Sequence, residues 1–148
     1  MEEIGVRLGT EDDLDALSAM NKQLIEDEGH ENPMGLEQLR SRMEAFIRSD
    51  HEAYLFESGG ELVGYALVRP ADDPVYLRQF FICREHRRKG YGTQAFDALL
   101  AALGISGVDV EVLAWNRPGL AFWRSLGFEE RSVLMRYSPP SRGPEGLP

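Results

Sequence analysis

The stretch VYLRQFFICREHRRKGYGTQAFDALL, residues 75–100, passes from an apolar segment through a basic one into two closely spaced glycines. Its first eight residues, VYLRQFFI, are rich in β-branched and aromatic side chains, which favours a strand. After the glycines, apolar residues recur at helical spacing up to Gly104, at Ala95, Phe96, Leu99, Leu100 and Leu103. We therefore predict a strand, a polar loop and a helix that begins near Gly92.

The polar loop between this strand and this helix predicts an anion-binding site. The first N–H groups of a helix have no intrahelical acceptor, and the helix dipole adds partial positive charge at the same point. Glycines let the backbone approach a phosphate closely, and the three side chains before them, Arg87, Arg88 and Lys89, are cationic. The alternative at this stage is a basic surface turn before an ordinary helix.

Two better-known phosphate motifs fit this stretch poorly. GYGTQA, residues 90–95, has the spacing of a dinucleotide-binding turn, in which a strand runs almost directly into the first glycine. Here the mostly charged segment CREHRRK separates Ile82 from Gly90. A P-loop needs four residues between its glycines and then Gly-Lys-Ser/Thr, which the chain lacks.

Composition narrows the class of protein and its partners. The chain has 148 residues, enough for one domain, and a formal charge of −9, which argues against nucleic-acid binding and favours cationic partners such as amines. It contains no apolar run of about 20 residues, so we expect no membrane span. The first ten residues lack a secretory signal pattern and Cys83 is the only cysteine, so we expect a cytoplasmic protein.

The rest of the chain predicts strands and helices around this unit. A strand is expected at residues 4–8, a helix after the N-cap Thr10, a second helix at 36–47, and a hairpin at 53–70 that turns at Gly59 and Gly60. Further elements are expected downstream: a strand at 107–114, a helix at 118–126, a last strand pair at 128–137 and a disordered tail at 139–148. This order indicates a mixed α/β sheet covered by helices.

Two motifs together resemble one family. RRKGYG, residues 87–92, is similar to the signature Arg/Gln-x-x-Gly-x-Gly/Ala of the GNAT superfamily of N-acetyltransferases. NRPGLAFWRSLGF, residues 116–128, resembles a second pattern of many members, with Gly119 at the usual alanine. The likeness is clear over residues 75–128, and the upstream elements fall in the family's order.

The resemblance implies a fold and a coenzyme. The fold would be one domain over residues 1–138, with a mostly antiparallel sheet of about six to seven strands, about four helices and a splayed parallel strand pair. The co-substrate would be acetyl-CoA, with no metal. Its pantetheine arm would meet the backbone of Phe80, Phe81 and Ile82, and its thiol end would lie near Asn116 and Phe122. The pyrophosphate would bind the loop Arg87, Arg88, Lys89, Gly90, Tyr91, Gly92 and Thr93.

The chemistry predicted from this resemblance is direct transfer of the acetyl group to a primary amine of a small molecule or peptide. Glu111 lies five residues before Asn116, as does the proposed base of ribosomal-protein alanine N-acetyltransferases, although a strand acid also often faces solvent. The Ile82 N–H is the predicted oxyanion donor. Trp123 stands where many members have a tyrosine that protonates the thiolate, so the general acid would be Tyr91, Tyr65, Tyr76 or water.

The acceptor and the assembly state are less determined. Residues 1–31 hold ten acids against two basic residues, and Glu28, His30 and Glu31 are candidates to line an amine pocket or to form a solvated face. The alternative functions are an acetyl-CoA-binding sensor or interaction module with little turnover, and a protein that binds nucleic acid through REHRRK. A monomer and a homodimer both fit the sequence.

Overall fold

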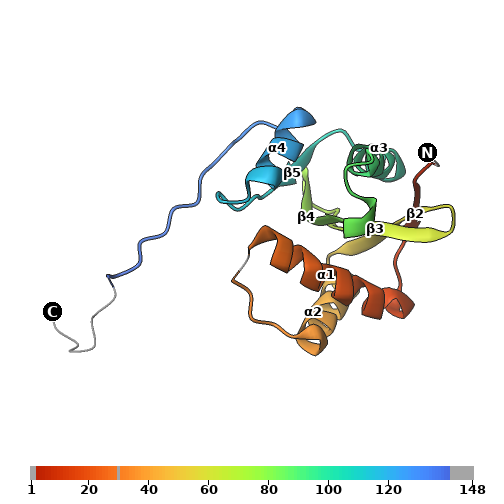
Figure 1. Cartoon of the computed structure of the whole chain (residues 1–148), viewed down its shortest axis with the longest axis horizontal. Coiled ribbons are helices and arrows are strands. Elements are labelled where there is room, and N and C mark those ends of the chain that lie inside the picture. Colours follow the sequence, from red (N-terminus) through yellow and green to blue (C-terminus); the bar gives the residue numbers. More distant parts are fainter. Residues whose placement is uncertain (1–2, 30, 141–148) are drawn as a thin grey trace.

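The computed structural model describes residues 3–29 and 31–140 and has one five-stranded sheet with the order β1-β2-β3-β4-β5 (Figure 1). The strands are β1 (Gly5–Leu8), β2 (Glu52–Ser58), β3 (Glu61–Arg69), β4 (Val75–Ile82) and β5 (Val108–Val110). The α-helices are α1 (Leu14–Glu28), α2 (Leu36–Arg48), α3 (Tyr91–Leu103) and α4 (Arg117–Ser125). Neighbouring strands are antiparallel except β4 and β5, which are parallel.

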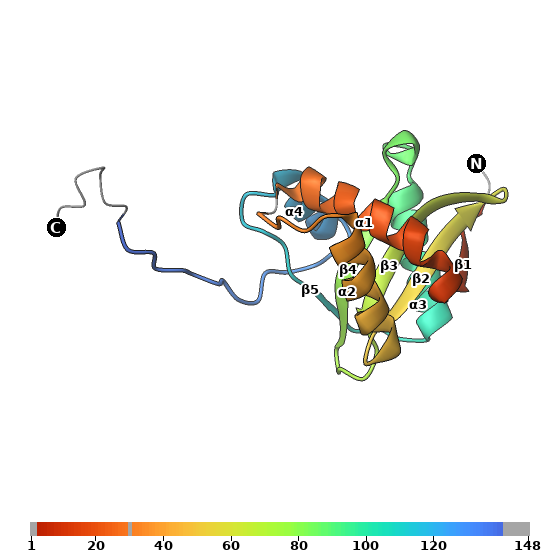
Figure 2. The ribbon, with the colours of Figure 1, turned by 90° about the horizontal axis from the view of Figure 1, so that it is seen from below.

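The sheet lies between two pairs of helices. Helices α1 and α2 cover one face, and α3 and α4 cover the other (Figure 1, Figure 2). On the first face Leu17 and Met43 pack around Tyr65 and Phe81, whereas Phe96 of α3 lies among apolar residues of the second face. The predicted mixed α/β class with four helices is confirmed.

The predicted helix cap at Thr10 and the predicted hairpin turn at Gly59 and Gly60 are both present. Thr10 accepts a hydrogen bond from the N–H of Asp12, and Asp13 accepts one from the N–H of Thr10, so the predicted cap starts the first helical segment. Gly59 and Gly60 both have positive φ, 60° and 78°, in the turn between β2 and β3.

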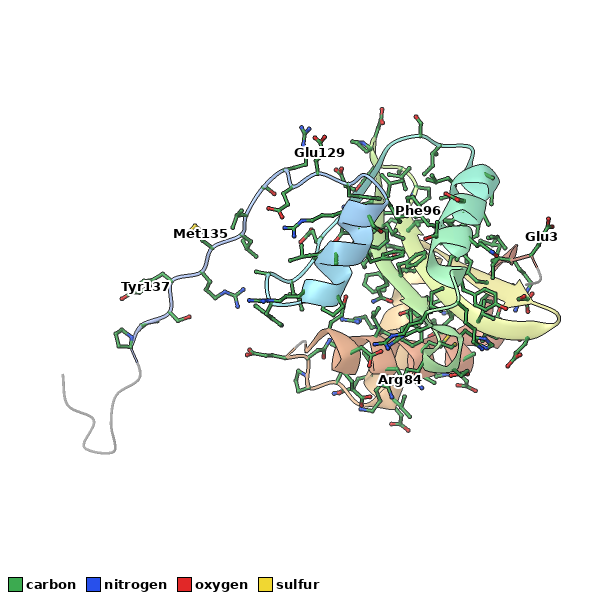
Figure 3. The ribbon with its side chains drawn as sticks, turned by 45° about the horizontal axis from the view of Figure 1, so that its top comes forward. Glu3, Arg84, Phe96, Glu129, Met135 and Tyr137 are labelled. Carbon is green, nitrogen blue, oxygen red and sulfur yellow. The ribbon has the colours of Figure 1, made fainter. Side chains whose placement is uncertain are left out.

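The predicted last strand pair at residues 128–137 is wrong. From residue 129 to residue 140 the chain forms no strand, and it leaves the body beyond α4 with Met135 and Tyr137 pointing away (Figure 1, Figure 3). Its apolar side chains, Val133, Leu134, Met135 and Tyr137, are between 75% and 87% exposed. No neighbouring strand pairs with this part of the described chain, and these apolar side chains stay exposed. The sheet therefore has five strands instead of the predicted six to seven. Of the predicted tail, residues 141–148 lie outside the described residues.

The feature of the sheet that matters for function is the short contact between β4 and β5. The two strands pair only from Val75 with Val108 to Leu77 with Val110. Strand β4 then continues to Ile82 beside β3 alone. A gap therefore opens at the carboxyl ends of the parallel pair, consistent with the predicted splay. Within residues 3–29 and 31–140, no helix is long and apolar enough to cross a membrane.

Candidate active site

A cavity of about 630 Å³ lies where this gap opens. The end of α1, the last residues of β4, the loop before α3 and the first turns of α4 surround it. Its lining includes most of the predicted coenzyme residues, namely Phe80, Phe81, Ile82, Arg87, Arg88, Gly90, Gly92, Thr93, Asn116 and Phe122. Lys89, Tyr91 and Glu111 are not among the lining residues.

In β4, the backbone N–H and C=O groups of every second residue point toward the gap. The Cys83 N–H donates to the Val63 carbonyl of β3 at 2.8 Å. Because successive residues of a strand direct their N–H and C=O groups to opposite sides, those of Ile82 and Phe80 point away from β3, and those of Phe81 point toward it. The Ile82 N–H, which is the predicted oxyanion donor, thus faces the gap. Its role in catalysis stays a prediction.

The loop before α3 has the geometry of an anion cradle. Arg88 and Gly90 have left-handed backbone conformations, with φ of 62° and 80°. Such turns point successive N–H groups into one concavity, and a non-glycine residue in this conformation is often found at functional sites. The first N–H groups of α3 open at the same place. The cradle and the dipole of α3 therefore both favour negative charge here.

Arg87 connects the loop to α1. Its guanidinium donates to Asp27 at 2.5 Å and to the Ile82 carbonyl at 2.8 Å, and it lies over the Phe81 ring. Arg84 also donates to Asp27, at 2.9 Å (Arg84 is labelled in Figure 3). Burial opposes ionisation of Asp27, but these two arginines outweigh it and hold the pKa of that carboxyl below its usual value.

The two cations that follow Arg87 are placed differently. The side chains of Arg88 and Lys89 are exposed, and no ion pair joins either of them to another residue in the described ranges. They remain available to a phosphate, whereas Arg87 mainly holds the loop in position. The sequence offered no signal for Asp27, because it lies 60 residues before its partner.

An aromatic cluster forms the wall of the cavity on the α4 side. Phe80 stacks on Phe122, with ring centroids 5.9 Å apart, and Trp123 meets Phe80 edge-on at 5.3 Å. Phe96, labelled in Figure 3, contacts Trp123 from α3 at 5.7 Å. Phe80 packs against the apolar core and both rings line the cavity, so contact of Phe80 and Phe122 with the coenzyme stays a prediction. Trp123 lines the cavity as well, with its indole held inside the cluster.

Asn116 caps α4 at the rim of the cavity. Its Oδ1 accepts a hydrogen bond from the Gly119 N–H at 3.1 Å. A Cβ on Gly119 would lie only 2.4 Å from the Asn116 Nδ2 atom, so this rotamer of Asn116 requires glycine at the usual alanine position.

Glu111 lies apart from the cavity lining. Its side chain is exposed, and its Oε1 accepts a hydrogen bond from the Tyr76 hydroxyl at 3.2 Å. Burial, together with the charge of Glu111, raises the pKa of Tyr76. The role of Glu111 as general base stays a prediction.

The tyrosines suggested as proton donors differ in their surroundings. Tyr65 is fully buried, and its hydroxyl donates to Gln79 at 2.7 Å. Burial raises its pKa far above the usual value, so it is a poor acid for a thiolate. Tyr91 packs edge-on against His86 outside the cavity.

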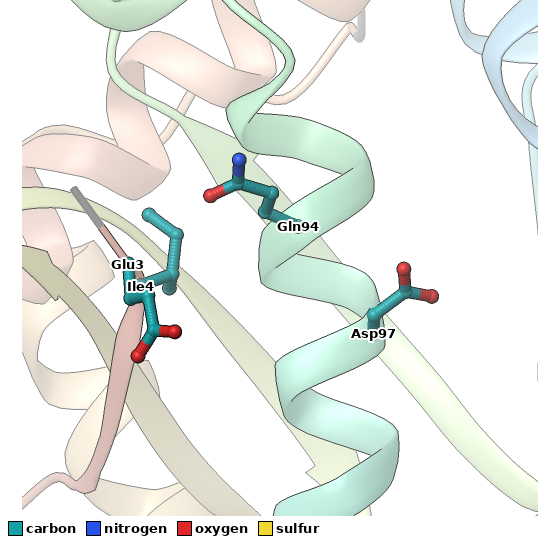
Figure 4. Close-up of a pocket in the computed structure, with 4 residues that line it drawn as sticks. All are labelled: Glu3, Ile4, Gln94 and Asp97. Atoms are coloured by element: carbon teal, nitrogen blue, oxygen red, sulfur yellow. The ribbon is translucent and has the colours of Figure 1, made fainter. Parts of the chain in front are cut away.

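Of the three residues suggested for an amine pocket, Glu28 lines the cavity and Glu31 is exposed outside it. His30 lies outside the described residues. A second hollow, of about 370 Å³, lies between the start of the chain and α3, lined by Glu3, Ile4, Gln94 and Asp97 (Figure 4). Two of its four lining side chains are carboxylates, which suits a polyanion poorly. Among the described residues, no cluster of His, Cys, Asp and Glu side chains could hold a metal ion.

Comparison with known families agrees with this geometry. Residues 17–128 match the model of the acetyltransferase (GNAT) family. The chain belongs to this family. It is therefore an acyl-CoA-dependent acetyltransferase, and the resemblance inferred from residues 87–92 and 116–128 is confirmed.

Relatives and solved structures place the chain within the family. It is 26% identical over 106 residues to the [ribosomal protein bS18]-alanine N-acetyltransferases of Escherichia coli K12 and Salmonella typhimurium, covering 68% of this chain and 72% of theirs. A possible acetyltransferase from Clostridium difficile has the same fold, with a TM-score of 0.72, 20% identity, and coverage of 95% of this chain and 100% of that one. Aminoglycoside N-acetyltransferase AAC(6')-Iy, solved with CoA, has a TM-score of 0.69 and 18% sequence identity. That match covers 95% of this chain and 97% of the aminoglycoside enzyme.

Proposed function

We propose that this GNAT protein transfers the acetyl group of acetyl-CoA to a primary amine of a small molecule or peptide. The observation that carries the proposal is the opening of the β4–β5 gap and the basic cradle into one cavity. A thioester arm and a pyrophosphate need these two environments at the same time. The names of the bS18-alanine and aminoglycoside enzymes both specify a nitrogen acceptor, which supports an amine.

In this proposal the pantetheine arm pairs with the backbone of Phe80 and Ile82 along the gap. The pyrophosphate binds the N–H groups from Arg88 to Thr93, with Arg88 and Lys89 supplying charge and Arg87 holding the loop. The amine attacks the thioester carbon, and the Ile82 N–H donates to the oxygen as it becomes an oxyanion. The C–S bond then breaks, the thiolate leaves with the electron pair, and the proton lost by the nitrogen goes by way of water to the thiolate, which gives the amide and free coenzyme A.

Acetyl-CoA is expected to raise the melting temperature of the protein. At a concentration 100-fold above its dissociation constant, a ligand stabilises the folded state by about 2.7 kcal/mol. For a chain of this size that corresponds to a rise of roughly 5–10 °C, measured by a thermal-shift titration. Pantetheine, which has the thiol arm of coenzyme A but no pyrophosphate, serves as the control, because only ligands with the pyrophosphate engage the whole cradle.

An amine panel then separates an enzyme from a sensor. The panel contains a peptide that begins with alanine, an aminoglycoside and 1,4-diaminobutane, and free thiol is the readout. Acetyl transfer to one of them supports the proposal. Tight coenzyme binding without transfer to any amine favours the alternative of a coenzyme-binding sensor, for which Trp123 in place of the usual tyrosine is the motivating feature.

Glu111→Gln is expected to lower kcat by about 100-fold at pH 7, which is the lower end of the effect of a general base. The loss should shrink as the pH rises toward the pKa of the amine, about 10.4 for a lysine-like group, because the neutral amine then forms unaided. The pH profile of kcat for both proteins measures this. Tyr76→Phe, which removes only the hydrogen bond to Glu111, is the matched variant. A wild-type profile for Glu111→Gln would exclude Glu111 as the base.

A further inference from the structure

Helix α1 ends at the cavity with three consecutive acids, Glu26, Asp27 and Glu28. The C-terminal end of a helix carries partial negative charge, so carboxylates there are unfavourable unless a cation compensates them. No basic residue occupies the last turn of α1. Compensation must therefore come from other parts of the molecule or from a ligand.

Two of the three acids have such partners. Asp27 pairs with Arg84 and Arg87, and Glu26 pairs with Arg84 at 3.3 Å. Glu28 differs, because no hydrogen bond or ion pair joins its carboxylate to another residue of the described chain, although the side chain is half-buried. Burial, with Asp27 adding to it, raises the pKa of Glu28. Glu28 is thus a cavity carboxylate without a cation.

The surroundings of Glu28 contain few groups that could neutralise it. The charged and titratable groups nearby are Asp27 on α1, Arg42 on α2, Tyr65 on β3, and Arg87 and Arg88 in the loop. Arg42 donates to Asn21, and Arg87 is held by Asp27. Arg88 also lines the cavity, in the loop to which we assign the pyrophosphate. The negative charge of Glu28 is therefore open to a ligand.

An aromatic side chain, Trp115, lies against Gly29, the residue that follows Glu28. A Cβ placed on Gly29 would lie 3.5 Å from the Trp115 Nε1 atom, so the indole covers the residue that follows Glu28. Trp115 is nevertheless 61% exposed. Carboxylates and indole faces are both groups with which proteins bind ammonium ions.

We propose that Glu28 binds a positively charged group of the acceptor and so selects cationic amines. This rests on the proposed function, since it assigns the acceptor end of the same cavity. Glu28 is a positioning residue here: its charge is uncompensated in the free protein and is matched when an ammonium group binds. The chemistry is that of an ammonium ion, whether the reacting amine or a second one on the same molecule.

The first test needs no substrate. The pKa of Glu28 is raised in the folded protein, so its protonated form favours folding, and that stability is lost as the pH rises through the folded-state pKa. Glu28→Gln should therefore melt at least about 2 °C higher than the wild type at pH 7, with the difference vanishing near pH 4. Glu26→Gln, which loses an ion pair on the same helix, should not be stabilised. A Glu28→Gln protein no more stable than wild type at pH 7 overturns the proposal.

The second test compares two probes of matched length, 1,4-diaminobutane and 4-aminobutan-1-ol. Their binding to the complex with coenzyme A is measured by calorimetry, so turnover is not required. Loss of one charge-assisted contact should weaken binding of the diamine to Glu28→Gln by about 10- to 100-fold, with Glu26→Gln unchanged. If Glu28→Gln weakens binding of the amino alcohol as much as binding of the diamine, Glu28 contacts the reacting amine. If it weakens binding of the amino alcohol less, Glu28 contacts the second amine. Unchanged diamine affinity overturns the proposal.

These results are distinguishable from a failure of the proposed function. If Glu28→Gln gives the expected result in both tests and the amine panel shows no transfer, the data support the cation site and contradict the proposed enzyme activity. If transfer occurs and KM for cationic amines is the same in Glu28→Gln and wild type, the data support the enzyme activity and contradict the cation site. Affinity for coenzyme A should be equal in both proteins.

Discussion

Gly64→Ala is expected to lower the free energy of unfolding by about 3 kcal/mol, at the upper end of what overpacking costs. A Cβ at this position of β3 would lie 2.1 Å from the Phe81 carbonyl oxygen on β4. That atom belongs to the backbone of a paired strand, so relief requires β4 itself to move. Chemical denaturation with a two-state fit measures the change.

The same substitution should also weaken coenzyme binding, because β4 would move away from β3 toward the gap to which we assign the thioester. Gly5→Ala is the matched control: it is also a strand glycine of this sheet, but its Cβ would lie at an ordinary 3.7 Å from the Glu57 carbonyl oxygen. The control should leave stability within about 0.5 kcal/mol of wild type. If Gly64→Ala costs as little as the control, the two strands are not in the close contact described.

The features that could be predicted from the sequence are those whose cause lies within a few residues. Thr10 and Asp13 satisfy each other across one turn, and Gly59 and Gly60 permit the hairpin by their own conformations. The loop before α3 is equally local, since its glycines, cations and helix start follow one another in the chain. Each prediction needed only short-range geometry.

Features that depend on a distant partner could not be predicted in the same way. The alternation at residues 128–137 is that of a strand, yet a strand forms only beside another, and the structure provides none there. Glu28 and Glu111 are both acids near predicted loops, but only the packing of α1 against the end of β4 brings Glu28 to the cavity. Arg87 is predicted as a phosphate ligand from its charge and its place in the signature, and its ion pair with Asp27 is missed because Asp27 is remote in sequence.

Gly92→Val is expected to weaken acetyl-CoA binding by between about 10² and 10⁴, the equivalent of losing two charge-assisted contacts. Gly92 lies in the first turn of α3 and lines the cavity beside the loop to which we assign the pyrophosphate. A Cβ there would also lie 2.9 Å from the Phe122 ring, which is held by its stack on Phe80 and so cannot easily turn away. Calorimetric titration of acetyl-CoA measures the loss.

Two further variants separate the causes of that loss. Ala101→Val places the same β-branched residue on the exposed face of α3, so it reports the cost of valine in this helix without touching the cavity, and coenzyme affinity should stay at the wild-type value. In Gly92→Val with Phe122→Ala, the ring that the valine meets is absent. If affinity returns to that of Phe122→Ala alone, the glycine serves the packing of α3 on α4. Because we assign Gly92 to the approach of backbone N–H groups to phosphate, we expect the double variant to bind at least about tenfold more weakly than Phe122→Ala.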